Sequence, residues 1–233
     1  MIIRYFLYLA LLFECFFASA QPDSIPPPPR QDKPNVTSLI VPATLTAYGF
    51  AALKFQVLKD LDRNIREEIW FDHPHGRTTV DNYLQYAPAA AVYILNAAGV
   101  KGRHDLLDRT TIYIMANAIM AIPVLSLKKV INAPRPDGSG NDGFPSGHVA
   151  TAFVAAEFLR QEFKDRSPWY GVAGYTTAAA TGFLRVYNDK HWFSELLAGA
   201  GIGMISARAA YWLFPAVKKK LFKQKTSVPV AIP

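Results

Sequence analysis

Residues 128–136 read KKVINAPRP, residues 145–148 read PSGH, and residues 185–195 read RVYNDKHWFSE. In each stretch, charged and polar residues stand where an apolar segment begins or ends. Two apolar segments separate the second stretch from the third. A chain that leaves along one helix and returns along the next ends on the side from which it started. The three stretches are therefore expected to meet at one end of a helical bundle.

The remainder of the chain predicts the same fold class. Its apolar segments lack the two-residue alternation of half-buried strands and are rich in alanine and leucine, which favours helices. We therefore predict an all-α bundle of five to six helices that is embedded in a membrane. These segments cover residues 37–53, 83–100, 110–127, 149–163, 169–186 and 192–214. The small residues from Ala198 to Gly203 predict a close approach of two helices.

Composition favours a membrane. Hydrophobic residues make up 51% of the 233 residues and charged residues only 18%, which is apolar for a soluble protein. The first residues, with Arg4, an apolar run and a small-residue site ending at Ala20, predict a signal peptide or N-terminal anchor over residues 1–20. A proline-rich linker (21–36), the helical domain (37–217) and a basic tail (218–233) follow. Lysines after an apolar helix usually flank a membrane, so we expect a membrane and no nucleic acid as partner.

The distribution of charge also predicts an orientation. The positive-inside rule puts the lysine-rich tail in the cytoplasm, so the start of the last apolar segment lies on the other side. A functional signal segment places residue 21 outside the cytoplasm as well. The two placements are compatible only if residues 37–53 do not cross the membrane. We expect a protein of the bacterial cell envelope, in the inner membrane, with its site facing the periplasm. The alternative is a bundle that never crosses and is held in or at the periplasmic space.

The cations of the three stretches predict a phosphate pocket. Lys128, Arg135 and Arg185 offer positive charge, and the two arginines present planar donor forks that suit phosphate oxygens. Ser146 and Gly147 stand just before a helix, where free backbone N–H groups and the helix dipole favour an anion. Phosphoryl transfer needs such a site, because its transition state spreads negative charge over three oxygens.

Two histidines complete a possible reaction. His191 and Glu195 are four residues apart and therefore expected on one helix face, where the carboxylate holds one imidazole nitrogen and the other nitrogen attacks phosphorus. His148 could donate a proton to the departing alkoxide. No acidic cluster near these positions offers ligands for a divalent metal, so no cofactor is expected. Asp81 and Asn82 precede an apolar segment and are interpreted as a helix cap.

Together the three stretches resemble the signature of the superfamily of type 2 phosphatidic acid phosphatases and vanadium haloperoxidases, in its bacterial lipid phosphatase branch. The resemblance covers Lys128 to Glu195 with its motifs. It implies a membrane-bound helical bundle in which His191 is the nucleophile and His148 the general acid. It also implies a phosphate site made by Lys128, Arg135, Ser146, Gly147 and Arg185. Two residues depart from the pattern: Leu184 replaces a serine, and Glu195 replaces an aspartate.

The function expected from this resemblance is the metal-independent hydrolysis of a lipid phosphate through a phosphohistidine intermediate. Phosphatidic acid, phosphatidylglycerol phosphate, a polyprenyl diphosphate and a lipid A phosphate all present suitable groups, and no motif chooses among them. Three alternatives stay open at this point. They are a vanadate-dependent haloperoxidase, a soluble periplasmic acid phosphatase and a non-catalytic phospholipid-binding membrane protein; only Leu184 and Glu195 favour the last.

Overall fold

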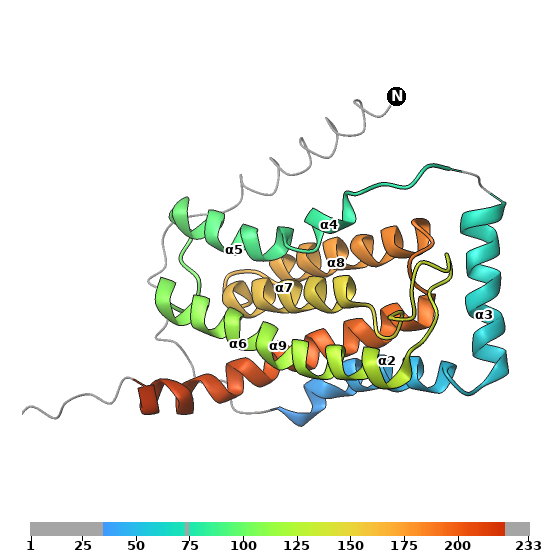
Figure 1. Ribbon diagram of the computed structural model, residues 1–233. Coiled ribbons are helices and arrows are strands. Elements are labelled where there is room, and N and C mark those ends of the chain that lie inside the picture. The colour runs from blue at the N-terminus through green and yellow to red at the C-terminus, as the bar shows by residue number, and fades with distance from the viewer. Residues whose placement is uncertain (1–34, 73–74, 222–233) are drawn as a thin grey trace, which may run out of the picture. The chain divides into compact units, whose positions relative to one another are not determined.

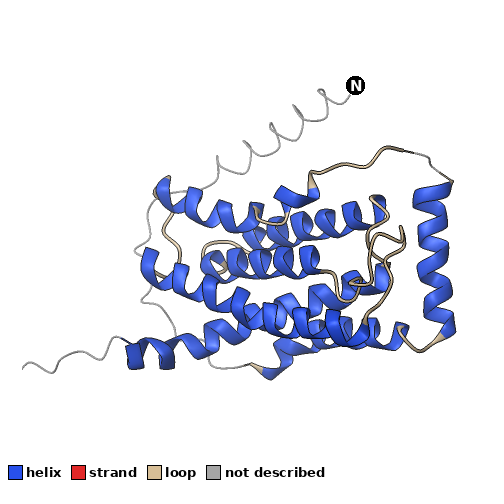
Figure 2. Ribbon diagram, viewed as in Figure 1, coloured by secondary structure: helices blue, strands red, loops and turns tan. Residues whose placement is uncertain are grey.

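The computed structural model describes residues 35–72 and 75–221. Throughout these two ranges the regular structure is helical and no strand occurs (Figure 2). The elements are η1 (Val36–Leu39), α2 (Ile40–Ala52), α3 (Gln56–Arg66), η2 (Glu67–Phe71), α4 (Asp81–Leu84), α5 (Ala87–Ala97), α6 (Leu106–Ile131), α7 (Gly147–Phe163), α8 (Trp169–Tyr187) and α9 (Phe193–Leu221). The all-α prediction is confirmed, and every predicted apolar segment corresponds to a helix.

Helix α7 is the centre of the bundle and contacts α5, α6, α8 and α9 (Figure 1). Val149, Val154 and Phe158 are at most 1% exposed, and each packs in a different hydrophobic cluster of the bundle. A helix that is apolar on several faces is stable where neighbouring helices enclose it. The enclosure of α7 fixes its first turn, where the PSGH stretch lies.

The small residues of α9 allow the close approach that the sequence predicted. A Cβ atom on Gly199 would lie 2.5 Å from the backbone oxygen of Ser146, and one on Gly203 would collide with the backbone of Ala150. Gly201 faces α2 instead, where a Cβ would meet Pro42 and Thr46. Because these positions carry no side chain, α9 packs directly on the start of α7.

Two helices are long and apolar enough to cross a membrane, judged over the described residues. They are α6 and α9. The helices α2 and α3, with their flanking turns, pass the same test only as a pair bent by 95°, which corresponds to a broken span or a re-entrant loop. The prediction that residues 37–53 do not cross therefore stays a prediction.

Helix α3 is the principal element that the sequence analysis missed. It is polar, with the sequence QVLKDLDRNIR, so a search for apolar segments passes over it. It runs across the end of the bundle beside the loops that precede α7 and α9 (Figure 1). The short helix α4 was also missed, because it was joined to α5 in one predicted segment.

Some of the predicted divisions of the chain fall outside the described residues. These are the segment 1–20, nearly all of the linker 21–36, and the tail from residue 222 onward. Within the described part, α9 continues past the expected domain boundary at residue 217 to Leu221. Lys218, expected in the tail, lies in α9 and forms an ion pair with Asp108 of α6.

Candidate active site

One end of the bundle gathers the polar residues that the sequence singled out. Lys128 lies in the last turn of α6 and Arg185 in the last turn of α8. Ser146 is the N-cap of α7, and Glu195 lies in the first turn of α9. The backbone N–H of Ser146 donates to the backbone oxygen of Glu195 at 3.1 Å, which joins the starts of α7 and α9. The predicted convergence of the three stretches is thus present in the structure.

The N-terminus of α7 is arranged to receive an anion. Ser146 is fully buried, and its hydroxyl oxygen has no hydrogen-bond partner among the described residues. At the next residue, a Cβ on Gly147 would lie 3.9 Å from Cε of Lys128, so the lysine side chain passes directly over the helix start. A hydroxyl, a cation and the free N–H groups of a 17-residue helix therefore face the same place.

His191 is 2% exposed, and its Nδ1 lies 2.8 Å from Oε2 of Glu195. The expectation that both residues share a helix face was wrong, because His191 lies in the loop before α9. The two side chains are nevertheless in contact, because the side chain of Glu195 points back toward this loop. Its Oε2 also accepts the backbone N–H of Trp192 at 3.2 Å, as in a capping box. With Nδ1 occupied, Nε2 is the nitrogen left for a substrate.

The cations lie close to His191. Burial lowers the pKa of His191 well below its ordinary value, and the charges of Arg185, Lys128 and Arg135 lower it further. The imidazole is therefore neutral at physiological pH. A neutral imidazole keeps the lone pair that a nucleophile requires.

Only some of the guanidinium donors of Arg185 are hydrogen-bonded to other residues of the protein. Its Nη1 donates to Oδ2 of Asp81 at 2.5 Å, and both side chains are almost fully buried. The Nε atom of the same guanidinium is buried and has no hydrogen-bond partner in residues 35–72 and 75–221. One edge of Arg185 is thus anchored by a carboxylate, while the Nε edge is left for an anion.

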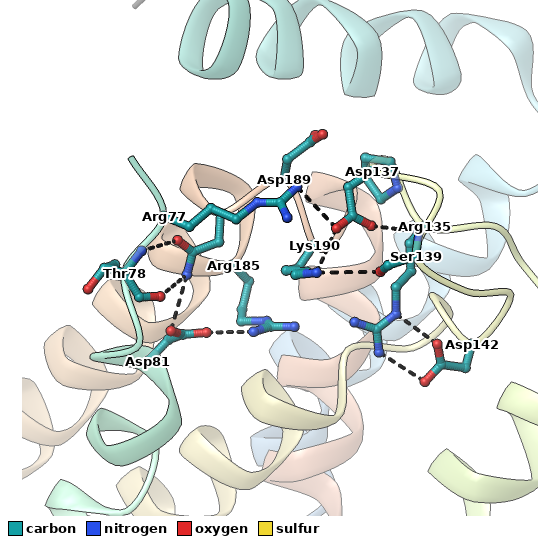
Figure 3. A network of polar contacts seen from close by, with 12 residues as sticks. Arg77, Thr78, Asp81, Arg135, Asp137, Ser139, Asp142, Arg185, Asp189 and Lys190 are labelled. Atoms are coloured by element: carbon teal, nitrogen blue, oxygen red, sulfur yellow. Dashed lines mark hydrogen bonds and ion pairs between the residues drawn. The ribbon is translucent and has the colours of Figure 1, made fainter. Parts of the chain in front are cut away.

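The carboxylate of Asp142 pairs with both Arg135 and Lys128, and Figure 3 shows its pairing with Arg135. Nε and Nη2 of Arg135 donate to the two oxygens of Asp142 at 2.7 and 2.9 Å. Lys128 lies 3.7 Å from the same carboxylate and also donates to the backbone oxygen of Asp142. Hydrogen bonds from Arg135 hold the pKa of Asp142 below its usual value. A phosphate that binds Arg135 must share or displace this carboxylate.

His148, in the first turn of α7, pairs with a residue that the sequence analysis had interpreted as a cap. Its Nε2 lies 2.9 Å from Oδ1 of Asn82 in α4. Burial, with Arg185 as the next cause, lowers the pKa of His148 to about 4. An anion bound among the cations would oppose this effect and favour the protonated form.

A sequence model of the PAP2 superfamily matches residues 109–219, which include all of these motif residues. The lipid A 1-phosphatase of Porphyromonas gingivalis is 37% identical over 155 residues, or 66% of this chain and 35% of that protein.

Over residues 109–219 the chain is therefore similar to the PAP2 superfamily.

Two further proteins are similar to this chain. The lipid A 4'-phosphatase of Bacteroides thetaiotaomicron is 33% identical over 110 residues, which are 46% of this chain and 45% of that protein. The chain thus spans about a third to a half of the length of these curated relatives. The crystal structure of a transmembrane PAP2-type phosphatidylglycerolphosphate phosphatase from Bacillus subtilis is 20% identical and has a TM-score of 0.52. It covers 78% of this chain and 97% of its own, and it shares the fold.

Several residues outside the PAP2 match also hold the site. From α3, Asp62 accepts the backbone N–H and the hydroxyl of Ser194 at 2.9 and 2.5 Å, which caps α9. One turn later, Arg66 donates to both oxygens of Asp189, at 2.7 and 2.9 Å, and to the backbone oxygen of Pro136. Asp62 and Arg66 are four residues apart, a spacing that could have indicated one functional helix face.

A second network joins the α6–α7 loop to the α8–α9 loop (Figure 3). Asp137 accepts from Lys190 at 2.6 Å and from the backbone N–H of Ser139 at 3.0 Å, and Arg77 lies 3.2 Å away. Although burial acts in the other direction, the hydrogen bonds from Lys190 and Ser139 lower the pKa of Asp137 to about 2. The carboxylate is therefore ionised at physiological pH and holds together the loops that carry Arg135 and His191.

Leu184 stands where the PAP2 pattern has serine. Its backbone oxygen accepts the N–H of Asn188 at 2.9 Å and ends α8. The leucine side chain has no donor to offer a phosphate, so that hydrogen bond is missing from the site. Ser146 and Arg185 still supply buried donors without partners.

Proposed function

We propose that the protein is a metal-independent phosphatase that hydrolyses a phosphate monoester of a membrane lipid through a phosphohistidine intermediate. One observation carries this proposal. Three cations and a helix N-terminus converge on a buried, neutral histidine whose far nitrogen is held by a carboxylate. This arrangement suits a group with several negative oxygens around an atom that accepts a nucleophile.

In the first step the phosphate binds Arg135, Arg185, Lys128 and the start of α7. Nε2 of His191 then attacks phosphorus, and the bond between phosphorus and the lipid oxygen breaks. Glu195 stabilises the positive charge that develops on the imidazole through its contact with Nδ1. The donors at the site stabilise the negative charge that the equatorial oxygens carry in the transition state.

His148 donates a proton to the departing lipid oxygen, so the lipid leaves as an alcohol. In the second step His148, now neutral, accepts a proton from water while the water oxygen attacks phosphorus. The bond between phosphorus and Nε2 breaks, inorganic phosphate is released, and both histidines return to their starting states. One water is consumed for each ester that is cleaved.

We propose a phosphate of lipid A as the substrate. Both curated relatives named above are lipid A phosphatases, one acting at the 1 position and one at the 4' position. Tyr83 and Tyr86, which are 77% and 52% exposed near the same end of the bundle, are available to contact the lipid or sugar portion. The lysines at the end of α9 support an orientation in which this end of the bundle faces the periplasm across the inner membrane.

The test is phosphate release from defined lipids by the purified, detergent-solubilised protein in the presence of a chelator. The panel contains lipid A bearing only a 1-phosphate, lipid A bearing only a 4'-phosphate, phosphatidylglycerol phosphate and phosphatidic acid. We expect release from one of the lipid A species that disappears in His191→Ala. Release that requires an added divalent metal would refute the metal-free mechanism. Absence of release with every lipid, together with vanadate-dependent bromide oxidation, would favour a haloperoxidase instead.

A further inference from the structure

The segment that leads into α4 is fixed to the end of α8. Asn188 donates to the backbone oxygen of Thr78 at 2.9 Å and accepts the backbone N–H of the same residue at 2.8 Å. Asp81, only 1% exposed, accepts from Asn188 at 3.1 Å and from Arg185 at 2.5 Å (Figure 3). Although α4 has only four residues, these contacts give it a defined position beside the active site.

The next residue, Asn82, is placed by this anchoring against the imidazole of His148. Its amide oxygen lies 2.9 Å from Nε2. An amide oxygen only accepts hydrogen bonds, so Nε2 carries a hydrogen in this contact. The proton that His148 exchanges with a substrate is then carried on Nδ1.

The two histidines are therefore supported in parallel but unequal ways. Nδ1 of His191 faces the buried carboxylate of Glu195, whereas Nε2 of His148 faces the neutral amide of an exposed residue. A carboxylate at the second position would stabilise the protonated imidazole strongly, but an amide does so only weakly. Weaker stabilisation of the protonated imidazole suits a group that must release its proton during the reaction.

The charged groups that act on His148 come from several elements around it. They are Lys128 of α6, Arg135 of the α6–α7 loop, Arg185 of α8, Asp81 of α4 and, when protonated, His191. The cations outnumber the single carboxylate. A change at Asn82 should consequently be visible in the titration of His148.

We propose that Asn82 is a positioning residue of the active site, which fixes the ring and the tautomer of His148 so that Nδ1 serves as the proton donor to the leaving group. The proposal rests on the proposed phosphatase function. Asn82 lies outside the part of the chain that matches the PAP2 superfamily. Through Asn82, helix α4 helps to position the proton donor, which the motif residues alone do not do.

The first test is the pH dependence of kcat/KM for the lipid substrate in Asn82→Asp. The new carboxylate beside Nε2 should raise the pKa of His148, so activity should persist to a pH about one unit higher than in the wild type. Thr79→Asp is the matched control, because Thr79 is exposed on the same segment and its side chain makes no described contact with His148. We expect the control to move the profile by less than about 0.3 unit, because solvent and salt screen an exposed charge.

The second test is Asn82→Ala, which removes the contact without adding charge. We expect kcat for the lipid to fall about tenfold, in keeping with a lost hydrogen bond that orients a catalytic group. The loss should be much smaller for p-nitrophenyl phosphate, whose leaving group needs no proton. Because Asn82 is exposed, neither variant is expected to impair folding. A merely structural role would lower both activities equally.

A measurement that needs no turnover tests the role of Asn82 independently of the proposed phosphatase function. In a His191→Ala background, the titration of His148 followed by NMR should move upward when Asn82→Asp is added. An unchanged titration, or an unchanged pH profile with full activity of Asn82→Ala, would overturn the role of Asn82. His191-dependent phosphate release would still stand in that case. If instead the wild type releases no phosphate from any ester, the proposed function fails while the NMR result still decides the contact.

Discussion

Two of the groups of buried charge in the bundle are built in opposite ways. In the first, here named the Glu157 cluster, a fully buried carboxylate lies at the centre and cations point toward it. Its oxygens accept hydrogen bonds from Arg160, Gln161, Tyr175 and Arg208. The cluster ties α7 to α8 and α9, and its central group has no capacity left for a ligand.

In the second group, the active site, cations lie close to His191 and carboxylates bind only part of their donors. Asp81 accepts a hydrogen bond from one edge of Arg185, and Asp142 accepts two hydrogen bonds from Arg135. Nε of Arg185 and the hydroxyl of Ser146 remain buried donors without partners. Both clusters contain buried charge, so buried charge alone does not mark a functional site. Donors in excess of acceptors mark a site for an anion.

The largest contrast is expected between His191→Ala and Glu157→Ala. The first removes the nucleophile, so turnover should fall by at least about a thousand-fold with little change in melting temperature. The second leaves two partly buried arginines without their carboxylate and should cost about 3 kcal/mol of stability. Activity per folded molecule should be retained in Glu157→Ala. Steady-state kinetics and thermal unfolding in the same detergent measure both effects, and a reversed pattern would mean that the two clusters were assigned the wrong roles.

Replacing arginine by lysine sharpens the same comparison. Arg185→Lys keeps the charge but removes the donor fork, so kcat/KM should fall about a hundred-fold. Arg208→Lys makes the same replacement in the Glu157 cluster and should lower the melting temperature with kcat/KM nearly unchanged. If Arg208→Lys harms catalysis as much as Arg185→Lys does, the active site extends through the bundle and the division into two clusters is wrong.

Asp142→Asn should have a smaller effect and in the opposite direction. The substitution removes the carboxylate that competes with phosphate for Arg135. Inhibition by inorganic phosphate should therefore tighten about fivefold, a change of about 1 kcal/mol. Asn141→Asp, on the exposed neighbouring residue, controls for a general effect of loop charge. Weaker inhibition in Asp142→Asn would show that Asp142 orients Arg135 rather than competing for it.

The smallest effect is expected for Glu195→Asp, which restores the residue that the PAP2 pattern has. Glu195 now reaches both His191 and the N–H of Trp192. The shorter side chain keeps the charge, so kcat should stay within about threefold of the wild type or rise. Glu195→Gln, which keeps the length but removes the charge, is the control and should lose more. A thousand-fold loss in Glu195→Asp would mean that the start of α9 has adjusted to the longer arm.

Much of the fold could be predicted from the sequence because its helices are apolar and the motifs stand at their ends. The predicted segments corresponded to α2 and α5–α9, and the positions of Ser146 and Arg185 relative to helix ends followed directly. Helix α3 could not be found in this way. Its stability comes from contacts such as Arg66 with Asp189, which join residues 123 positions apart.

The site was predictable as a set of motif residues but not as a network. The spacing of His191 and Glu195 predicted their contact, although not that His191 precedes the helix. Asp81 and Asn82 gave a helix-cap signal, and nothing local indicated that they would face Arg185 and His148. Such contacts depend on the packing of α4 against α8, which the sequence pattern does not contain.

The most direct test of the account is the trapping of the intermediate on His191. His148→Ala should slow breakdown of the phosphorylated enzyme, so it is mixed with an activated phosphate ester and quenched at alkaline pH, where phosphohistidine is stable. We expect a single phosphate on residue 191, located by mass spectrometry, and none when His191→Ala is added. Phosphate on another residue, or turnover without any phosphorylated enzyme, would contradict it.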